Sequence, residues 1–532
     1  MGVFIRRGGA LGMKNCMEQS TTTSHPRFTW GLILNVLAVL VVLVGGWLLG
    51  RVLLSPNWAR AVTVVGLGAA LVALFAKPGA GLLLWILLAP YAKYIYLTLQ
   101  MGRGIPDLDL TRLATLVLLF LLIAQAGAHS RAPLLAHGRA SLPPLTWPDA
   151  AMIGFVIAMA LSIPASWLGP VNGAQTLFDF IVIPFLVYYF ARNWLAKIPA
   201  RGRGQNALMA TVGTVALTGF LLGLITAREQ ITGQALFSPV QYELAYGSNI
   251  RKVLSVFRSP AAMSAALAIT VPFQLLGIRL LNPLHPGSPK VPVEGKTAVR
   301  GLLGLALLTT LAGVFFAYVR AGWLGAVLGI IVMVWLSPGI RRALLPLLLV
   351  MLIAGTVLAI AVIRPEAVLA RLAAEGPISY RLQAWQIAWE IFRSSPLLGI
   401  GYDNFGRTAV AQFGWNPHAV RMVANVPAVH NTYLYTLVSG GLIALLPYLG
   451  IFLTLALRFR QFWRQHERPS EITAGGKTST ETRDMVATLW ATLLGYLVII
   501  GTFDAFNAQF ANMLFFLIVG TLLGNLEREV AV

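Results

Sequence analysis

Residues 431–457 read NTYLYTLVSGGLIALLPYLGIFLTLAL, an uncharged and largely apolar run that ends just before Arg458. As a helix, such a run is long enough to cross the roughly 30 Å hydrocarbon layer of a membrane. Comparable runs of about 15 to 25 residues recur along the chain. The candidate spans begin near Trp30, Ala61, Gly79, Leu110, Asp149, Thr176, Ala207, Ala261, Arg300, Gly322, Ala343, Asn431, Met485 and Asn507.

The composition agrees with a membrane protein. Apolar residues make up 57% of the 532 residues and charged residues 11%, whereas a soluble domain carries about 25% charged residues. The mean hydropathy is +0.75, and the alternating pattern of a membrane β-barrel is not seen. The sequence therefore predicts an all-α polytopic integral membrane helical bundle of about 12 to 14 transmembrane helices.

The distribution of basic residues predicts topology. The net charge is +21, but the basic residues occupy short connections rather than one soluble basic face, so no nucleic-acid partner is expected. By the positive-inside rule, the connections rich in Lys and Arg are cytoplasmic. With an even number of spans, both termini are then cytoplasmic. Three segments are expected outside: Arg228 to Arg258, the turn at Arg320, and the loop from Arg364 to Val429.

This topology divides the chain into segments. The N-terminal region lacks a signal-peptide cleavage site, so the first span is expected to be a signal anchor. The single cysteine, Cys16, lies in the N-terminal tail, so no disulfide or cysteine-based metal site is expected in the outer loops. The predicted segments are a cytoplasmic tail (1–29), transmembrane helices 1–11 (30–363), a periplasmic catalytic loop with short amphipathic helices (364–429), transmembrane helices 12–14 (430–525) with a cytoplasmic linker (458–484), and a cytoplasmic tail (526–532).

One part of the outer loop combines a cation with helical periodicity. The residues at helical spacing are Arg381, Trp385, Ala388 and Phe392. Ser379 is suited to cap this helix, which would place Arg381 in the first turn. An arginine fork beside free helix N–H groups can bind phosphate. The alternative is a helix that lies on the bilayer surface with its arginine among lipid headgroups.

Arg320 is a second candidate cation. It lies in the short sequence Tyr318-Val319-Arg320-Ala321-Gly322, between two apolar runs on the side where arginines are scarce. Its guanidinium must meet water or an anion. The alternative is a side chain that extends to the membrane surface without binding a ligand.

His430 is a candidate general base. Asn425 and Pro427 resemble a helix cap and first turn, which would place His430 in the opening turn of the span that follows. A helix N-terminus favours the neutral imidazole, as a general base requires. The alternative is a hydrogen-bonded structural histidine.

The remaining polar residues carry weaker signals. Arg258 precedes a capping serine and a proline at the start of a span, so it is either a second phosphate contact or part of an ordinary helix start. Asp403 and Glu390 are acids in the outer loop, where single carboxylates are usually solvated. No pair of carboxylates has the spacing of a hard-cation site, so neither a metal nor another cofactor is expected.

Together these residues resemble one family. The relevant series is Arg381-x3-Trp385-x2-Ala388-x3-Phe392-x3-Pro396-x2-Gly399-x-Gly401-x3-Phe405, then His430-Asn431-x-Tyr433-Leu434 and Gly440-Gly441-Leu442. The series resembles the signature of the O-antigen ligase and O-antigen polymerase superfamily. Arg320-Ala321-Gly322 occupies the place of a Ser-Arg-Gly type turn in that family, with Val319 in place of the serine.

The resemblance implies a metal-independent glycosyltransferase of the bacterial inner membrane, active at the periplasmic face. Its donor would be a glycan linked to undecaprenyl diphosphate, and its acceptor a growing glycan or a lipid A core. The implied catalytic residues are Arg320, Arg381 and His430: the arginines hold the pyrophosphate, with Arg258 as a further contact, and the histidine activates the acceptor hydroxyl.

Other functions remain open from the sequence. Polymerase, ligase and protein-glycosylating members share these motifs, and the absence of a further module for a protein acceptor slightly favours a polymerase. A transporter or flippase for a lipid-linked or anionic solute would place ionisable residues at mid-membrane and show broken helices near them. In a non-enzymatic membrane scaffold, the grouping of two arginines and a histidine would be a coincidence.

Overall fold

The computed structural model describes most of the chain from Val72 to Ala531. The described residues all belong to the compact unit Asn57–Val532. They are Val72, 77–92, 110–129, 145–196, 203–237, 253–257, 259–281, 293–342, Ile353, 376–413, 428–465 and 479–531.

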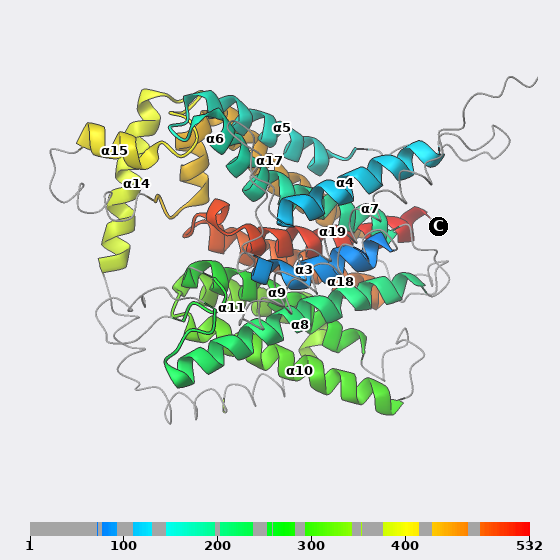
Figure 1. Cartoon of the computed structure of the whole chain (residues 1–532). Helices are drawn as coiled ribbons and strands as arrows, with labels where there is room; N and C mark the ends of the chain where they lie inside the picture. Colours follow the sequence, from blue (N-terminus) through cyan, green and yellow to red (C-terminus); the bar gives the residue numbers. More distant parts are fainter. Residues whose placement is uncertain are drawn as a thin grey trace, which may run out of the picture. The chain divides into compact units, whose positions relative to one another are not determined.

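Every regular element in these ranges is helical (Figure 1). The longer elements are α3 (Pro78–Ala92), α4 (Leu110–His129), α5 (Trp147–Ser162), α6 (Gly169–Leu177), α7 (Ile183–Ala196), α8 (Arg203–Thr232), α9 (Pro260–Leu280), α10 (Val293–Phe316), α11 (Arg320–Leu336), α14 (Gly376–Ser394), α15 (Phe405–Phe413), α17 (Thr432–Gln465), α18 (Ser479–Ile500) and α19 (Gln509–Ala531). Short turns of other helix types are η1 (Ile163–Ala165), η2 (Phe178–Val182) and η3 (Ala505–Asn507).

The described helices confirm an all-α polytopic membrane protein. Eight of the described helices are long and apolar enough to cross a membrane, and three shorter apolar helices accompany them. The predicted spans near Trp30, Ala61 and Ala343 lie outside the described residues. The total of about 12 to 14 spans and the division into segments therefore stay predictions.

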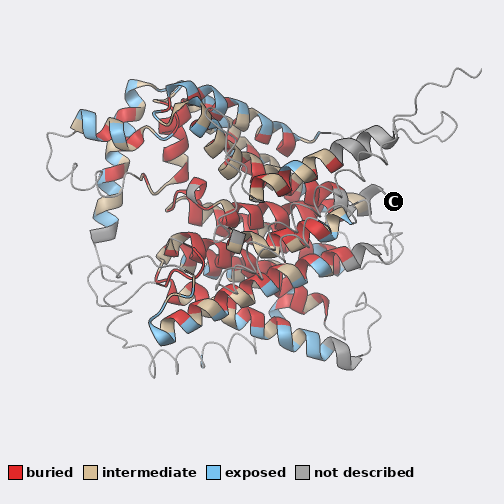
Figure 2. Cartoon of the chain, viewed as in Figure 1, coloured by how far each residue is buried: buried red, intermediate tan, exposed pale blue. Residues whose placement is uncertain are grey.

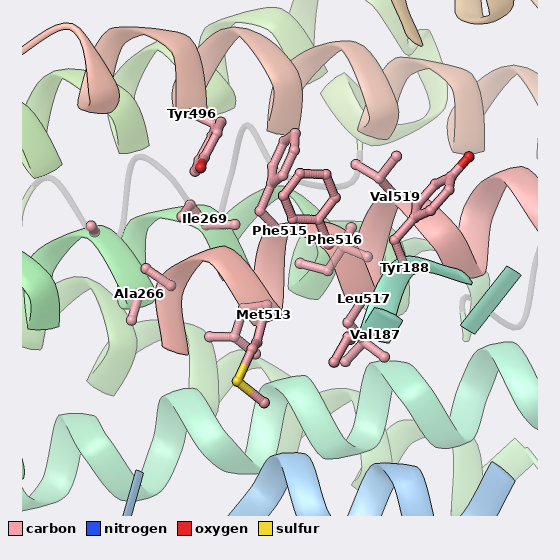
Figure 3. Close-up of a cluster of buried hydrophobic side chains, with 14 of the residues drawn as sticks. Val187, Tyr188, Ala266, Ile269, Tyr496, Met513, Phe515, Phe516, Leu517 and Val519 are labelled. Atoms are coloured by element: carbon pink, nitrogen blue, oxygen red, sulfur yellow. The ribbon is translucent and has the colours of Figure 1, made fainter. Parts of the chain in front are cut away.

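Two helices form the centre of the bundle. In α9 and in α19, 94% of the apolar window is buried, and both appear red along most of their length in Figure 2. A small residue allows α19 to pack closely against α7, since a Cβ added at Gly520 of α19 would lie 2.5 Å from the carbonyl oxygen of Tyr188 in α7. Figure 3 shows the aromatic part of this core, where the rings of Tyr496 and Phe515 stack with centroids 3.9 Å apart.

The two ends of the bundle are fastened differently. At one end, formed by the start of α5 and the ends of α7 and α19, Arg192 pairs with Asp149 and with Glu527, each at 2.7 Å. We call this the ion-pair end. At the other end, formed by the starts of α17 and α19 and the end of α18, hydrogen bonds from backbone N–H groups to side-chain oxygens join distant parts of the chain. We call this the site end because it contains the candidate residues.

Candidate functional site

Arg320 is the first residue of α11, directly after the turn that follows α10. The turn is tight because Tyr318 adopts a left-handed conformation (φ 52°). The indole of Trp323 donates to the carbonyl oxygen of Val314 at 2.9 Å and joins the two helices. Gly322 packs directly against Ser264 of α9, where a Cβ would collide with the serine hydroxyl. The expected short turn is confirmed, and it holds Arg320 at the edge of the central helix.

Arg381 lies in the second turn of α14, because this helix begins at Gly376. The prediction that Ser379 caps the helix and that Arg381 lies in its first turn is therefore wrong. The buried face of α14 comprises Ala384, Ala388 and Ile391. The indole of Trp385 donates to the carbonyl oxygen of Val429 at 3.0 Å. Protein contacts rather than lipid headgroups thus fix this face of the helix.

The segment after α14 is inserted into a break in α17. Gly441 departs from helical geometry (φ 63°, ψ −161°). Backbone bonds from the inserted segment replace the helical ones: Ile400 N to Val438 O (2.9 Å), Gly401 N to Ser439 O (3.1 Å) and Leu442 N to Pro396 O (2.9 Å). A Cβ at Gly399 would lie 2.5 Å from the Val438 carbonyl oxygen. The glycines of the sequence motif thus permit a backbone junction between the outer loop and a membrane helix.

His430 precedes α17 instead of lying in its first turn. The helix begins at Thr432, and Asn431 is its cap, since its side-chain oxygen accepts from the N–H groups of Tyr433 (3.0 Å) and Leu434 (3.1 Å). The prediction that His430 lies in the first turn of this helix is therefore wrong, because His430 lies just before the helix begins. Asn425 and Pro427, the residues proposed as the cap and first turn, lie outside the described residues.

The backbone of His430 has a left-handed conformation (φ 53°), which is uncommon for a residue other than glycine. The carboxylate of Asp504 stabilises it by accepting from the N–H groups of His430 (3.0 Å) and Asn431 (3.1 Å). Thr432 adds a second attachment, because its hydroxyl donates to Phe503 O (2.7 Å) and accepts from Ala505 N (2.9 Å). Such over-determined strained conformations are typical of functional sites.

Sequence reasoning missed Asp504. The available signal was an acid in the short connection between two long apolar runs, a position where a charge is costly unless it has a role. The residue is only 2% exposed. Burial raises the pKa of its carboxyl group to about 6, although the two backbone N–H groups and the positive charge of Arg381 oppose this rise.

The two candidate arginines are electrostatically coupled. Burial and, next in size, the positive charge of Arg320 lower the pKa of Arg381, while Asp504 acts in the opposite direction. The rings of Tyr380 and His430 lie 5.7 Å apart, so α14 also contacts the loop before α17. Arg381 is thus within electrostatic range of both Arg320 and Asp504, and Asp504 holds the backbone of His430, so residues identified separately in the sequence lie in one region.

The remaining candidates separate into different cases. Arg258 lies outside the described residues, although the predicted helix start is present, with Ser259 Oγ accepting from Ala262 N at 3.4 Å. Glu390 is exposed and pairs with Arg393 of its own helix at 3.5 Å, as expected for a solvated acid. Asp403 differs, because its backbone carbonyl oxygen accepts from the indole N–H of Trp167 at 2.8 Å and burial raises the pKa of its carboxyl group. No group of three or more His, Cys, Asp or Glu residues in the described ranges is placed to hold a metal ion.

The comparison with known families bears on this same region. Residues 305–449 match the family described as O-antigen ligase, a range that contains Arg320, Arg381 and His430 and ends before Asp504. No curated protein matches the chain. The match over residues 305–449 supports a relationship to the O-antigen ligase superfamily for this part of the chain.

Proposed function

We propose that the protein is a glycosyltransferase that moves a glycan from undecaprenyl diphosphate to an acceptor hydroxyl in surface or exopolysaccharide assembly. The observation that carries the proposal is the coupling of Arg320 with Arg381 beside His430, inside the segment that matches the O-antigen ligase family. Two guanidinium groups on separate helices form a pair suited to a diphosphate, whereas isolated surface arginines would have no reason to converge.

The arginines are proposed to stabilise the leaving group when the sugar–diphosphate bond breaks. Cleavage of the sugar–diphosphate bond leaves the electron pair on the diphosphate, so negative charge grows on the leaving group. Charge-assisted hydrogen bonds contribute about 1.5–3 kcal/mol each and strengthen as that charge develops. Since arginine stays protonated, the partial burial that lowers the pKa of Arg381 strengthens its attraction for a phosphate without removing its charge.

His430 is proposed to assist formation of the new glycosidic bond. The acceptor hydroxyl oxygen attacks the anomeric carbon while the imidazole takes its proton, a role that typically contributes about 10²- to 10⁴-fold. Asp504 holds the backbone of His430 and Asn431, so we assign it a positioning role. Attack opposite the leaving group would invert the anomeric centre. This mechanism requires no metal ion, because the two arginines balance the charge of the diphosphate.

Transfer with purified protein tests the function. The reaction contains a lipid-diphosphate repeat unit, with or without a lipid A core acceptor, and the products are resolved by size. Longer glycans without the core would identify a polymerase, and glycan joined to the core would identify a ligase. Activity should persist in EDTA. Absence of transfer in both reactions would reject the proposal, and magnesium-dependent recovery after EDTA would reject the metal-free mechanism.

The proposed orientation places the site end in the periplasm of an inner-membrane protein. Two exposed glutamines can report this, Gln412 in α15 at the site end and Gln461 near the far end of α17. Each is replaced by cysteine in a Cys16→Ser background, and spheroplasts, in which the outer face of the inner membrane is accessible, are treated with an impermeant thiol reagent. We expect labelling of Gln412→Cys alone. Labelling of Gln461→Cys alone would reverse the orientation.

A further inference from the structure

An exposed tryptophan lies beside the site, contributed by a part of the chain outside the family match. Trp167 lies between η1 and α6 and is 51% exposed. Its indole N–H donates to the carbonyl oxygen of Asp403 at 2.8 Å, and its backbone N–H donates to Oδ1 of Asn404 at 2.9 Å. Because its polar group is used within the protein, the exposed part of Trp167 is mainly the apolar ring.

The turn that receives Trp167 is itself held rigidly. The Asn404 amide nitrogen donates to the carbonyl oxygens of Ala165 (2.6 Å) and Ile400 (2.7 Å). The N–H of Tyr402 donates to the carbonyl oxygen of Ser162 at 3.3 Å. The end of α5 and the loop between α14 and α15 are therefore joined on both sides of Trp167, so the ring is fixed before any ligand arrives.

Two charged groups flank the ring. The guanidinium carbon of Arg407, in α15, lies over one face of the Trp167 ring, 5.4 Å from its centroid. Asp403 is exposed and has a left-handed backbone conformation (φ 58°). Trp167 thus offers a flat apolar surface between a hydrogen-bond donor and an acceptor.

This surface is linked to the region of Asp504 through the charge of Asp403. The negative charge of Asp403 is one of the groups that raise the pKa of Asp504, so the two carboxyl groups lie within electrostatic range. A tryptophan that only anchors the protein in a membrane interface would direct its N–H to water or headgroups. The N–H of Trp167 is instead turned inward, to the loop that carries Asp403.

We propose that Trp167, Asp403 and Arg407 form a carbohydrate subsite that binds a sugar ring of the transferred or receiving glycan. A pyranose has an apolar face of C–H groups and a rim of hydroxyl groups. The ring of Trp167 can pack against the apolar C–H face. The carboxylate of Asp403 and the guanidinium of Arg407 can form hydrogen bonds with the hydroxyl groups. This inference rests on the proposed function and adds to it the recognition of sugar by a segment outside the matched domain.

Glycan binding to the full-length protein tests the subsite directly. The probe is the glycan released by mild acid from the lipid-linked donor, labelled with a fluorophore. Trp167→Ala should weaken its binding about 3- to 10-fold, the range of an aromatic contact, while binding of glycan-free undecaprenyl diphosphate stays unchanged. Trp389→Ala is the matched control, since Trp389 is 50% exposed on α14. Equal glycan binding by the two variants would overturn the proposal.

A second variant separates stacking from a structural role. Trp167→Phe keeps an aromatic ring but cannot donate to Asp403. If the ring binds sugar, this variant should retain most of the glycan affinity. An affinity as low as that of Trp167→Ala would show that Trp167 only fastens the two loops, and would overturn the proposal.

Steady-state kinetics identify which sugar occupies the subsite. A rise in the acceptor KM for Trp167→Ala at saturating donor assigns the acceptor sugar, and a rise in the donor KM assigns the donor glycan. Unchanged KM values for both would overturn the proposal. The binding measurement requires no transfer, so a protein that binds glycan through Trp167 without transferring it would refute the enzymatic function alone.

Discussion

Arginines at the two ends of the bundle have different surroundings. At the ion-pair end, Arg192 is bonded to the carboxylates of Asp149 and Glu527, both at 2.7 Å. At the site end, the charged group with the largest effect on Arg381 is another arginine, Arg320. The acid nearby, Asp504, uses both carboxylate oxygens to hold backbone N–H groups. The contrast indicates that Arg192 is neutralised by carboxylates for stability at one end, whereas at the other end a second arginine acts on Arg381, where an anionic ligand would relieve the repulsion.

The largest effect is expected at the ion-pair end. Arg192→Ala would leave two carboxylates without their buried partner, which should lower the free energy of unfolding by about 3–5 kcal/mol. Thermal unfolding in detergent measures the loss. Arg393→Ala is the control, because the Arg393 side chain is 65% exposed in its pair with Glu390 and should change stability very little. Equal stability of the two variants would remove the structural role assigned to Arg192.

The second effect concerns activity rather than stability. Arg381→Ala removes a cation from a like-charged pair, so the thermal stability should be retained while turnover falls about 10²- to 10³-fold. Arg381→Lys keeps the charge but loses the planar fork, and should also be impaired. Arg320→Ala should behave as Arg381→Ala does, and the double variant should be little worse than the worse single one. Wild-type turnover in either alanine variant would exclude that residue from the site.

A smaller loss is expected when the positioning residue is altered. Asp504→Asn keeps one oxygen acceptor for the two N–H groups that the carboxylate now receives. Turnover should fall about 10- to 100-fold, less than the full contribution of a general base, while binding of undecaprenyl diphosphate is retained. His430→Ala should show the same separation with a larger loss. Weakened diphosphate binding by Asp504→Asn would contradict the assignment.

The smallest effect is a change in pH dependence. Asp403 contributes to the raised pKa of the Asp504 carboxyl group, which is about 6. Asp403→Asn removes this repulsion, so the pKa of Asp504 should fall. Because the ionised carboxylate holds both N–H groups, turnover should decline as pH drops through this pKa, and the decline should begin at lower pH in the variant. Turnover at saturating substrates, measured as a function of pH, tests this shift. If the acidic side of the pH profile is the same in Asp403→Asn and the wild type, the electrostatic effect of Asp403 on Asp504 is contradicted.

The sequence predicted the membrane class more reliably than the local structure around the candidate site residues. Long apolar runs depend only on composition, so most span starts agree with the helices. The starts of α14 and α17 were misplaced because tertiary bonds define them. The indole of Trp385 in α14 donates to the carbonyl oxygen of Val429. Asn431 caps α17 while the Asp504 carboxylate accepts from the N–H groups of His430 and Asn431.

Asp504 and Trp167 show what a linear sequence does not provide. Both are single residues without a local motif, and each acquires its role from a partner far along the chain, His430 in one case and Asp403 in the other. The role of Gly399 and Gly401 was hidden for the same reason, since their partner is the break in α17 at Gly441.

The central claim is that Arg320 and Arg381 together bind a diphosphate. The most direct test compares the affinities of the wild-type protein and the two alanine variants for undecaprenyl diphosphate and undecaprenyl monophosphate, both without glycan. The account predicts that the wild type prefers the diphosphate and that either variant loses most of this preference. A preference that is unchanged in both variants would contradict it.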